Sequence, residues 1–109
     1  MRYRLLPLLL TAACTSETPA VATGPTDRDA RYRCQDFVEQ RLVSPSTATH
    51  SDSANTKVFN TGGGTFSVRG YVDSQNQMGG TVRAEYMCFL RHVGGDNWEA
   101  DSVLLKPRV

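Results

Sequence analysis

The sequence lacks an excess of charge of either sign. Of its 109 residues, 12 are Lys or Arg and 11 are Asp or Glu, so the formal net charge is +1. Nucleic-acid binding requires clustered positive charge that neutralises phosphates, and the composition gives no support for it. We therefore expect no nucleic-acid partner.

The residues that build metal and catalytic sites are also scarce. His50 and His92 are the only histidines, and neither has a carboxylate or cysteine at metal-ligand spacing. No Gly-x-Ser-x-Gly motif is present, and Gly62–Gly64 lacks the Lys-Ser/Thr of a phosphate loop. We expect two ordinary surface histidines, no metal, no cofactor and no enzyme activity.

Long apolar runs are absent as well. The run from Leu5 to Leu10 is interrupted by Pro7, and it is far shorter than the roughly twenty residues that span a bilayer. Arg2 and Arg4 precede this run, and small residues follow it. This order is typical of an export signal, and it is favoured here over the alternative of a buried N-terminal strand.

The end of this segment, Leu10 to Cys14, resembles a bacterial lipobox, although Thr11 stands where that family prefers a branched apolar residue. The resemblance implies a signal peptide at 1–13 and a diacylglycerol lipid, with further acylation such as palmitate, on Cys14. The polar residues up to 26 would then form a flexible tether, and 27–109 a small domain. Thr15 is not the aspartate that resembles an inner-membrane retention signal, so a Gram-negative host would place the protein at the outer membrane.

An alternative cleavage site stays open at Ala20-Val21-Ala22, an A-x-A pattern. Cleavage after Ala22 would discard Cys14 and release a soluble secreted protein. Either route leaves Cys34 and Cys88 as a pair in an oxidising compartment, where a disulfide persists. Two free buried thiols are the alternative to that disulfide.

The residues after the tether predict one helix. Thr26 or Asp27 can cap its start, and Ala30, Cys34, Phe37, Val38 and Leu42 form an apolar stripe at spacings of three and four. Ser44-Pro45 is expected to end the helix, because the residue before proline avoids the α region.

The rest of the chain alternates with period two, which predicts strands at 57–60, 65–73, 81–93 and 98–105. Gly-rich turns are expected at 61–64 and 94–97. The predicted fold is α+β: one helix covering a face of a four-stranded antiparallel meander. A disulfide between Cys34 and Cys88 would tie the helix to the sheet.

The connection between the second and third of these strands is longer than a tight hairpin needs. Its side chains are uncharged hydrogen-bonding groups with one methionine, and exposed loops on a rigid sheet are common binding sites. A plain connector is the alternative, because loops are polar for solvation alone. The candidate binding residues are Ser74, Gln75, Asn76, Gln77 and Met78.

Three segments together, Pro45–Ala48, Gly70–Asn76 and Tyr86–Cys88, resemble a group of small exported bacterial and phage-associated domains. The resemblance covers about 34–105 and implies the domain without a transferable activity. The expected function is a lipid-anchored cell-envelope protein with a non-catalytic interaction domain that modulates a neighbouring envelope protein. The alternative is a soluble secreted binding or inhibitor domain.

Overall fold

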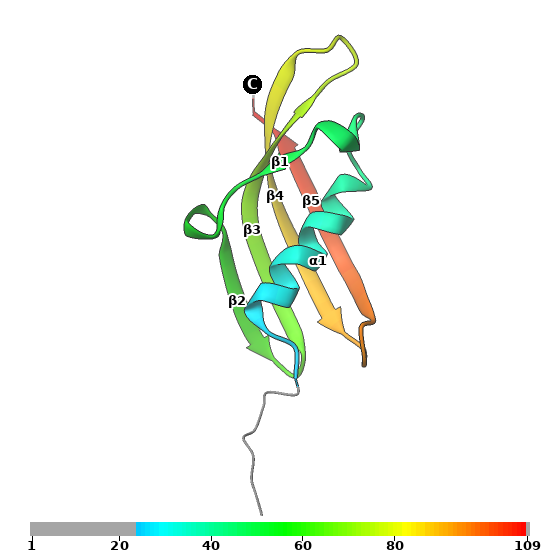
Figure 1. Ribbon diagram of the computed structural model, residues 1–109. Helices are drawn as coiled ribbons and strands as arrows, with labels where there is room; N and C mark the ends of the chain where they lie inside the picture. The colour runs from blue at the N-terminus through cyan, green and yellow to red at the C-terminus, as the bar shows by residue number, and fades with distance from the viewer. Residues whose placement is uncertain (1–23, 109) are drawn as a thin grey trace, which may run out of the picture.

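The computed structural model describes residues 24–108 (Figure 1). The predicted signal peptide at 1–13, the predicted lipidation site Cys14, nearly all of the predicted tether and the alternative cleavage site after Ala22 lie outside these residues. Within them, no helix is long and apolar enough to cross a membrane. The elements are α1 (Asp27–Glu39), β1 (Thr49–His50), β2 (Lys57–Gly62), β3 (Thr65–Gln75), β4 (Thr81–His92) and β5 (Trp98–Pro107), with short 3-10 turns at Pro45–Thr47 and Ser53–Asn55.

Helix α1 is capped by Thr26, one of the two capping residues that the sequence leaves open. Asp29 N donates to Thr26 Oγ1 (3.1 Å), and Thr26 N donates to Asp29 Oδ2 (3.0 Å), so the two side chains form a reciprocal capping box. The hydrogen bonds from Thr26 hold the pKa of the Asp29 carboxyl below its usual value. The positive end of the helix dipole favours the same charged form.

The helix ends at Glu39, earlier than the predicted stop at Ser44. Arg41 N donates to the Val38 carbonyl (2.9 Å) and Leu42 N to the Glu39 carbonyl (3.2 Å), so tighter three-residue turns replace the α-helical pattern. These turns let Leu42 pack against the core. They also bring Arg41 Nη1 to the Val103 carbonyl of β5 (3.2 Å). Tertiary contacts therefore end the helix before proline does.

The sheet is antiparallel and has five strands, where the sequence predicts four. The order is β1-β3-β4-β5, and β2 also pairs with β3. The additional strand, β1, pairs Thr49 and His50 with Asp73 and Val72. Two residues are too few to show a period-two pattern, which explains why the sequence does not reveal it. The predicted four-strand meander is present as β2–β5.

Helix α1 covers one face of the sheet, and the hydrophobic core lies between these two layers (Figure 1). Ala30, Cys34 and Val38 are the buried residues of the helix. Cys34 and Cys88 are joined by a disulfide, with their Cα atoms 5.8 Å apart, so the predicted cross-link is confirmed and the alternative of free thiols is wrong. The buried residues of the sheet are Phe66, Val68, Val72, Ala84, Tyr86, Cys88, Leu90 and Val103.

Candidate functional site

The structure divides the predicted binding loop between strand β3 and a turn. Ser74 pairs with Val82 and Gln75 with Thr81, so Ser74 and Gln75 belong to β3 rather than to a loop. Gln75 N also donates to Thr47 Oγ1 (2.9 Å). The connection itself spans only 76–80.

Asn76 holds the shape of this turn. Its Oδ1 accepts hydrogen bonds from Met78 N (2.9 Å) and Gly80 N (3.0 Å), and its backbone N donates to the Gly80 carbonyl (2.8 Å). The Asn76 side chain is therefore used within the turn. Gln77 and Met78 are exposed, and Met78 is 91% accessible to solvent. Gln75 and Asn76 are exposed as well, but the hydrogen bonds of Asn76 hold its side chain in the turn, so Gln77 and Met78 are the more available side chains of the connection.

His50 is not the ordinary surface histidine that the sequence predicts. Pairing of β1 with β3 places it beside the end of α1, where its side chain is only 10% exposed. His50 Nε2 lies 2.7 Å from Glu39 Oε2, and its ring meets the edge of Tyr86 at 6.2 Å between centroids. His50 Nδ1 is buried with no hydrogen-bond partner. The imidazole therefore joins the helix end to the sheet.

His92 is half-buried at the opposite end of the sheet. Its Nε2 lies 2.8 Å from the Gly95 carbonyl, and its ring packs edge-on against Trp98 at 5.1 Å. Among residues 24–108, no group of three or more His, Cys, Asp or Glu side chains is placed to hold a metal ion. Both histidines thus take part in packing.

A group of hydroxyls lies under the segment between β1 and β2. Ser51 Oγ and Thr56 Oγ1 are 2.7 Å apart, and Tyr71 N donates to Ser51 Oγ (3.2 Å). A Cβ at Gly70 would lie 2.6 Å from Ser51 Oγ and 2.7 Å from the Tyr86 hydroxyl. Burial raises the pKa of the Tyr86 phenol above its usual value. The hydroxyls fill the space that Gly70 leaves.

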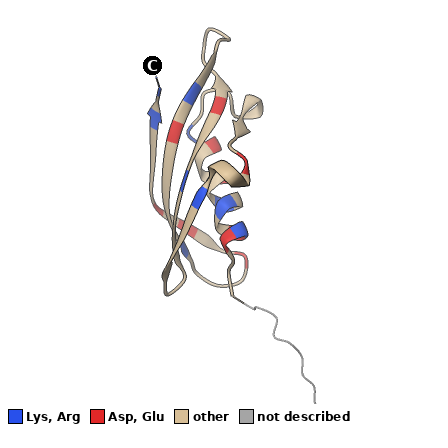
Figure 2. Ribbon diagram, turned by 90° about the vertical axis from the view of Figure 1, so that its left-hand side faces the viewer, with Lys and Arg blue, Asp and Glu red and all other residues tan. Residues whose placement is uncertain are grey.

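The sheet face opposite the helix carries no covering element in the described part of the chain. Strand residues alternate between faces, so the residues between the core positions point away from α1. Lys and Arg positions lie along these strands (Figure 2). The outward residues of β3 and β4 at the middle of the face are Arg69, Tyr71, Asp73, Arg83, Glu85 and Met87.

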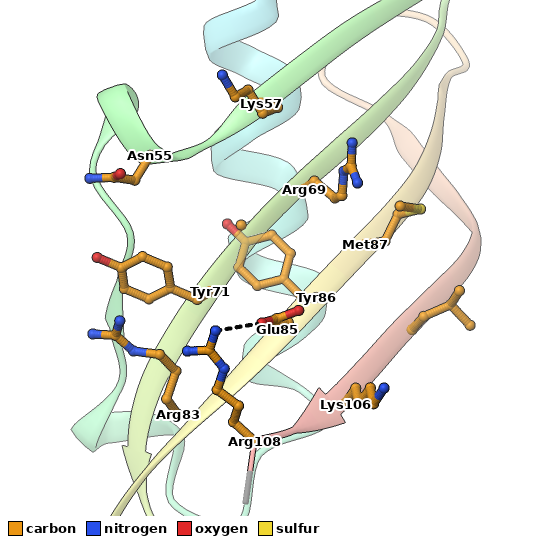
Figure 3. Close-up of a pocket in the computed structure, with 12 residues that line it drawn as sticks. Asn55, Lys57, Arg69, Tyr71, Arg83, Glu85, Tyr86, Met87, Lys106 and Arg108 are labelled. Atoms are coloured by element: carbon orange, nitrogen blue, oxygen red, sulfur yellow. Dashed lines mark ion pairs between the residues drawn. The ribbon is translucent and has the colours of Figure 1, made fainter.

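This face is hollowed by an open pocket of about 540 Å³ (Figure 3). Ligand sites are typically concave and of this size. Five cationic side chains and a single carboxylate, Glu85, line the pocket. The lining residues are Asn55, Lys57, Arg69, Gly70, Tyr71, Arg83, Glu85, Tyr86, Met87, Leu104, Lys106 and Arg108.

Two of the five cations have carboxylate partners. Arg83 makes a bidentate ion pair with Asp73 (2.8 and 2.9 Å), and its guanidinium stacks 3.8 Å from the centroid of Tyr71. Hydrogen bonding to Arg83 lowers the pKa of Asp73. Arg108 Nη2 lies 3.1 Å from Glu85 Oε2 (Figure 3). These pairs hold one end of the pocket in a defined geometry.

The other three cations, Lys57, Arg69 and Lys106, have no ion pair with any residue between 24 and 108. Lys57 of β2 lies directly opposite Arg69 of β3 in the antiparallel pairing. Like charges directly opposite each other destabilise a sheet. The pocket thus contains unneutralised positive charge.

Comparison with known proteins identifies no relative: no protein-family model, curated protein or solved structure matches the chain. The resemblance to small exported bacterial and phage-associated domains therefore stays a prediction. The geometry of the sheet face is the basis for assigning a function.

Sequence reasoning misses the pocket as a site. The alternation in β3 does place Arg69, Tyr71 and Asp73 on one side of the strand. The alternation does not reveal how the strands pair, and it is the pairing that brings Lys57 beside Arg69 and Lys106 beside Glu85. Because these residues are far apart in the chain, no local motif marks the cluster.

Proposed function

We propose that the protein is a non-catalytic binding domain of the cell envelope, anchored by a lipid on Cys14, whose exposed sheet face docks a protein partner. The observation that carries this proposal is the pocket on that face, with three unpaired cations beside exposed apolar side chains. Phe59, Phe89 and Leu104 are all exposed on this side of the sheet. Apolar and charged groups gathered on an uncovered face are typical of an interaction surface.

A binding role fits the placement of the titratable side chains better than catalysis does. The lining of the pocket includes neither His50 nor His92. Glu85 is paired with Arg108, and Asp73 with Arg83. General acid–base catalysis most often uses a histidine or a carboxylate beside the substrate, and in the described chain the histidines lie outside the pocket lining while Glu85 and Asp73 are engaged in ion pairs.

The location is proposed from the N-terminal sequence together with the disulfide. Cross-links of this kind persist in oxidising compartments and are rare in the cytosol. The LTAAC stretch then favours lipid attachment at Cys14, with outer-membrane placement, facing the periplasm or the surface, in a Gram-negative host. Release after Ala22 as a secreted binding or inhibitor domain is the second candidate, favoured by the A-x-A pattern at Ala20–Ala22.

Intact-mass measurement of the mature protein from membrane and supernatant fractions tests the location. We expect a membrane-bound species that starts at Cys14 and carries a diacylglycerol group. A species that starts at Thr23 and is found in the supernatant would replace the lipoprotein by the secreted alternative.

Site-specific photo-cross-linking in intact cells tests the docking face. A benzoylphenylalanine is placed in turn at Leu104 on the sheet face, at Gln77 in the turn, and at Asp36 on the exposed side of α1. We expect a discrete protein adduct from position 104 and none from position 36. Adducts from position 77 alone would transfer the function to the turn, and the absence of a face-specific adduct would contradict the proposal.

A further inference from the structure

The charges on the sheet face point to the chemistry of the partner, and this inference rests on the proposed function. We infer that the pocket binds an acidic peptide segment of the partner, with Lys57 and Arg69 pairing with its carboxylates. Lys106 and the apolar side chains of Met87 and Leu104 supply the neighbouring contacts.

The strongest support is the Lys57–Arg69 pair itself. These two exposed cations occupy directly opposed positions on β2 and β3, and neither has a carboxylate partner among the described residues. Elsewhere on the same face, cations lie beside acids: Arg83 with Asp73, Arg91 with Glu99 and Asp101. Arg83 and Arg91 are thus neutralised by neighbouring carboxylates, whereas the positive charges of Lys57 and Arg69 repel each other. An incoming anion would relieve that repulsion.

The cross-strand register extends this pair into a row of mixed character. Lys57 and Arg69 are followed by Met87 on β4 and Leu104 on β5, in directly paired positions. Leu104 is 56% exposed and Met87 is partly buried. A segment crossing the strands would meet two cations and then two apolar side chains. An acidic peptide that also carries apolar residues is complementary to this row.

The shape of the face favours a peptide over a lipid surface or a nucleic acid. A bilayer is flat and would meet the rim of a hollowed face before its floor. A nucleic acid presents a long series of phosphates and is bound through many cations, whereas this pocket offers three unpaired ones. Within the pocket, the ring of Tyr71 is already covered on one side by Arg83, which restricts base stacking on that ring.

A random twelve-residue peptide library displayed on phage gives a direct test with the purified mature protein as the target. We expect selected peptides to be enriched in Asp and Glu interspersed with apolar residues. Synthetic copies of these peptides are then measured by fluorescence anisotropy against variants. Replacing both cations (Lys57→Gln with Arg69→Gln) is expected to weaken binding at least tenfold, and raising the salt concentration to weaken it further.

Arg33→Gln and Leu104→Asp complete the design. Arg33→Gln removes one positive charge from α1, on the other layer, and should change the affinity less than twofold, whereas each single variant of the pair (Lys57→Gln or Arg69→Gln) should weaken binding more than that. Circular dichroism and retention of the disulfide establish that each variant is folded. Equal loss of affinity in Arg33→Gln and in the Lys57/Arg69 variant would overturn the inference, because general charge attraction would then explain binding.

The remaining outcomes separate the inference from the proposed function. Selected peptides without acidic enrichment that still lose affinity in Leu104→Asp would refute the acidic partner and retain the docking face. Peptides unaffected by every face variant would refute both. Binding to phosphatidylglycerol vesicles or to a single-stranded oligonucleotide, but not to acidic peptides, would also overturn the inference.

Discussion

Gly70 shows how a single residue decides the local packing beside the pocket. It lies within β3, on the side facing the helix, and its missing side chain leaves room for Ser51 and the Tyr86 hydroxyl. Ser51 in turn accepts a hydrogen bond from Tyr71 N. The glycine is therefore required for space and not for an unusual backbone angle. Gly70 stands between Arg69 and Tyr71 in the chain, so the packing of the Ser51 and Tyr86 hydroxyls against it lies directly behind these two outward residues.

Gly70→Ala is expected to destabilise the protein by about 1–3 kcal/mol, because overpacking displaces neighbouring atoms. Urea unfolding measures the change. Gly80→Ala is a matched control: its added Cβ would come no nearer than 3.7 Å to another group, and exposed sites of this kind change stability by about 0.5 kcal/mol or less. Equal stability of the Gly70 variant and the wild type would contradict the packing argument.

For single residues, the sequence predicts the role of some side chains correctly and that of others wrongly. The cap at Thr26 and the burial of Cys34 follow from local patterns, because capping and helical periodicity depend on near neighbours. His50 does not, because its burial depends on β1 joining β3 beside the end of α1. Asn76 resembles a ligand-binding side chain in sequence, yet it bonds to its own turn.

Among the elements, α1 and β4 are joined most directly, through Cys34–Cys88. The cysteines are 54 residues apart, and closing a loop of that size restricts the unfolded chain strongly. The described domain is small, so its core alone provides little reserve of stability. The cross-link is thus a large part of what holds the helix on the sheet.

Replacing both cysteines (Cys34→Ala with Cys88→Ala) is expected to lower the free energy of unfolding by about 4 kcal/mol, mainly through the entropy of the unfolded chain. Urea unfolding of this variant and of the wild type, with and without reductant, checks the value. Reductant should destabilise the wild type and leave the variant unchanged. A wild type that keeps its midpoint after full reduction would contradict the prediction.

The edge strand β5 is protected against pairing with other chains. Arg41 donates to the outward carbonyl of Val103, Pro107 lacks an N–H group, and the pairing with β4 shifts register beside Leu90. Exposed edges are prone to intermolecular pairing. The early end of α1, which the sequence does not predict, is what brings Arg41 to this edge.

For the molecule as a whole, the overall α+β architecture could be predicted from periodicity, but the candidate site could not. The balanced net charge conceals a cluster that forms only when β2, β3 and β5 come together. Acidic residues lie mainly elsewhere: on α1, at the ends of strands and in pairs with arginines. Charge separation is thus a property of the folded surface.

Lys57→Glu separates stability from binding. Replacing a like-charge pair by an opposite-charge pair across the strands should stabilise the fold by about 0.2–1 kcal/mol. The same change should abolish binding of acidic peptides. Thermal unfolding and anisotropy measure the two effects, and Lys57→Gln should be intermediate in both. A less stable Lys57→Glu variant would show that the lysine serves the fold.

Because the disulfide forms only in an oxidising compartment, the stability of the domain depends on which compartment the chain is in. A chain that remains in the reducing cytosol would lack the cross-link between helix and sheet, and would open and be degraded more readily. If the chain is exported as proposed, the domain would reach its full stability, and with it a stable sheet face, only after crossing the membrane. The protein would thus become competent to engage a partner on the side of the membrane where that partner is reached.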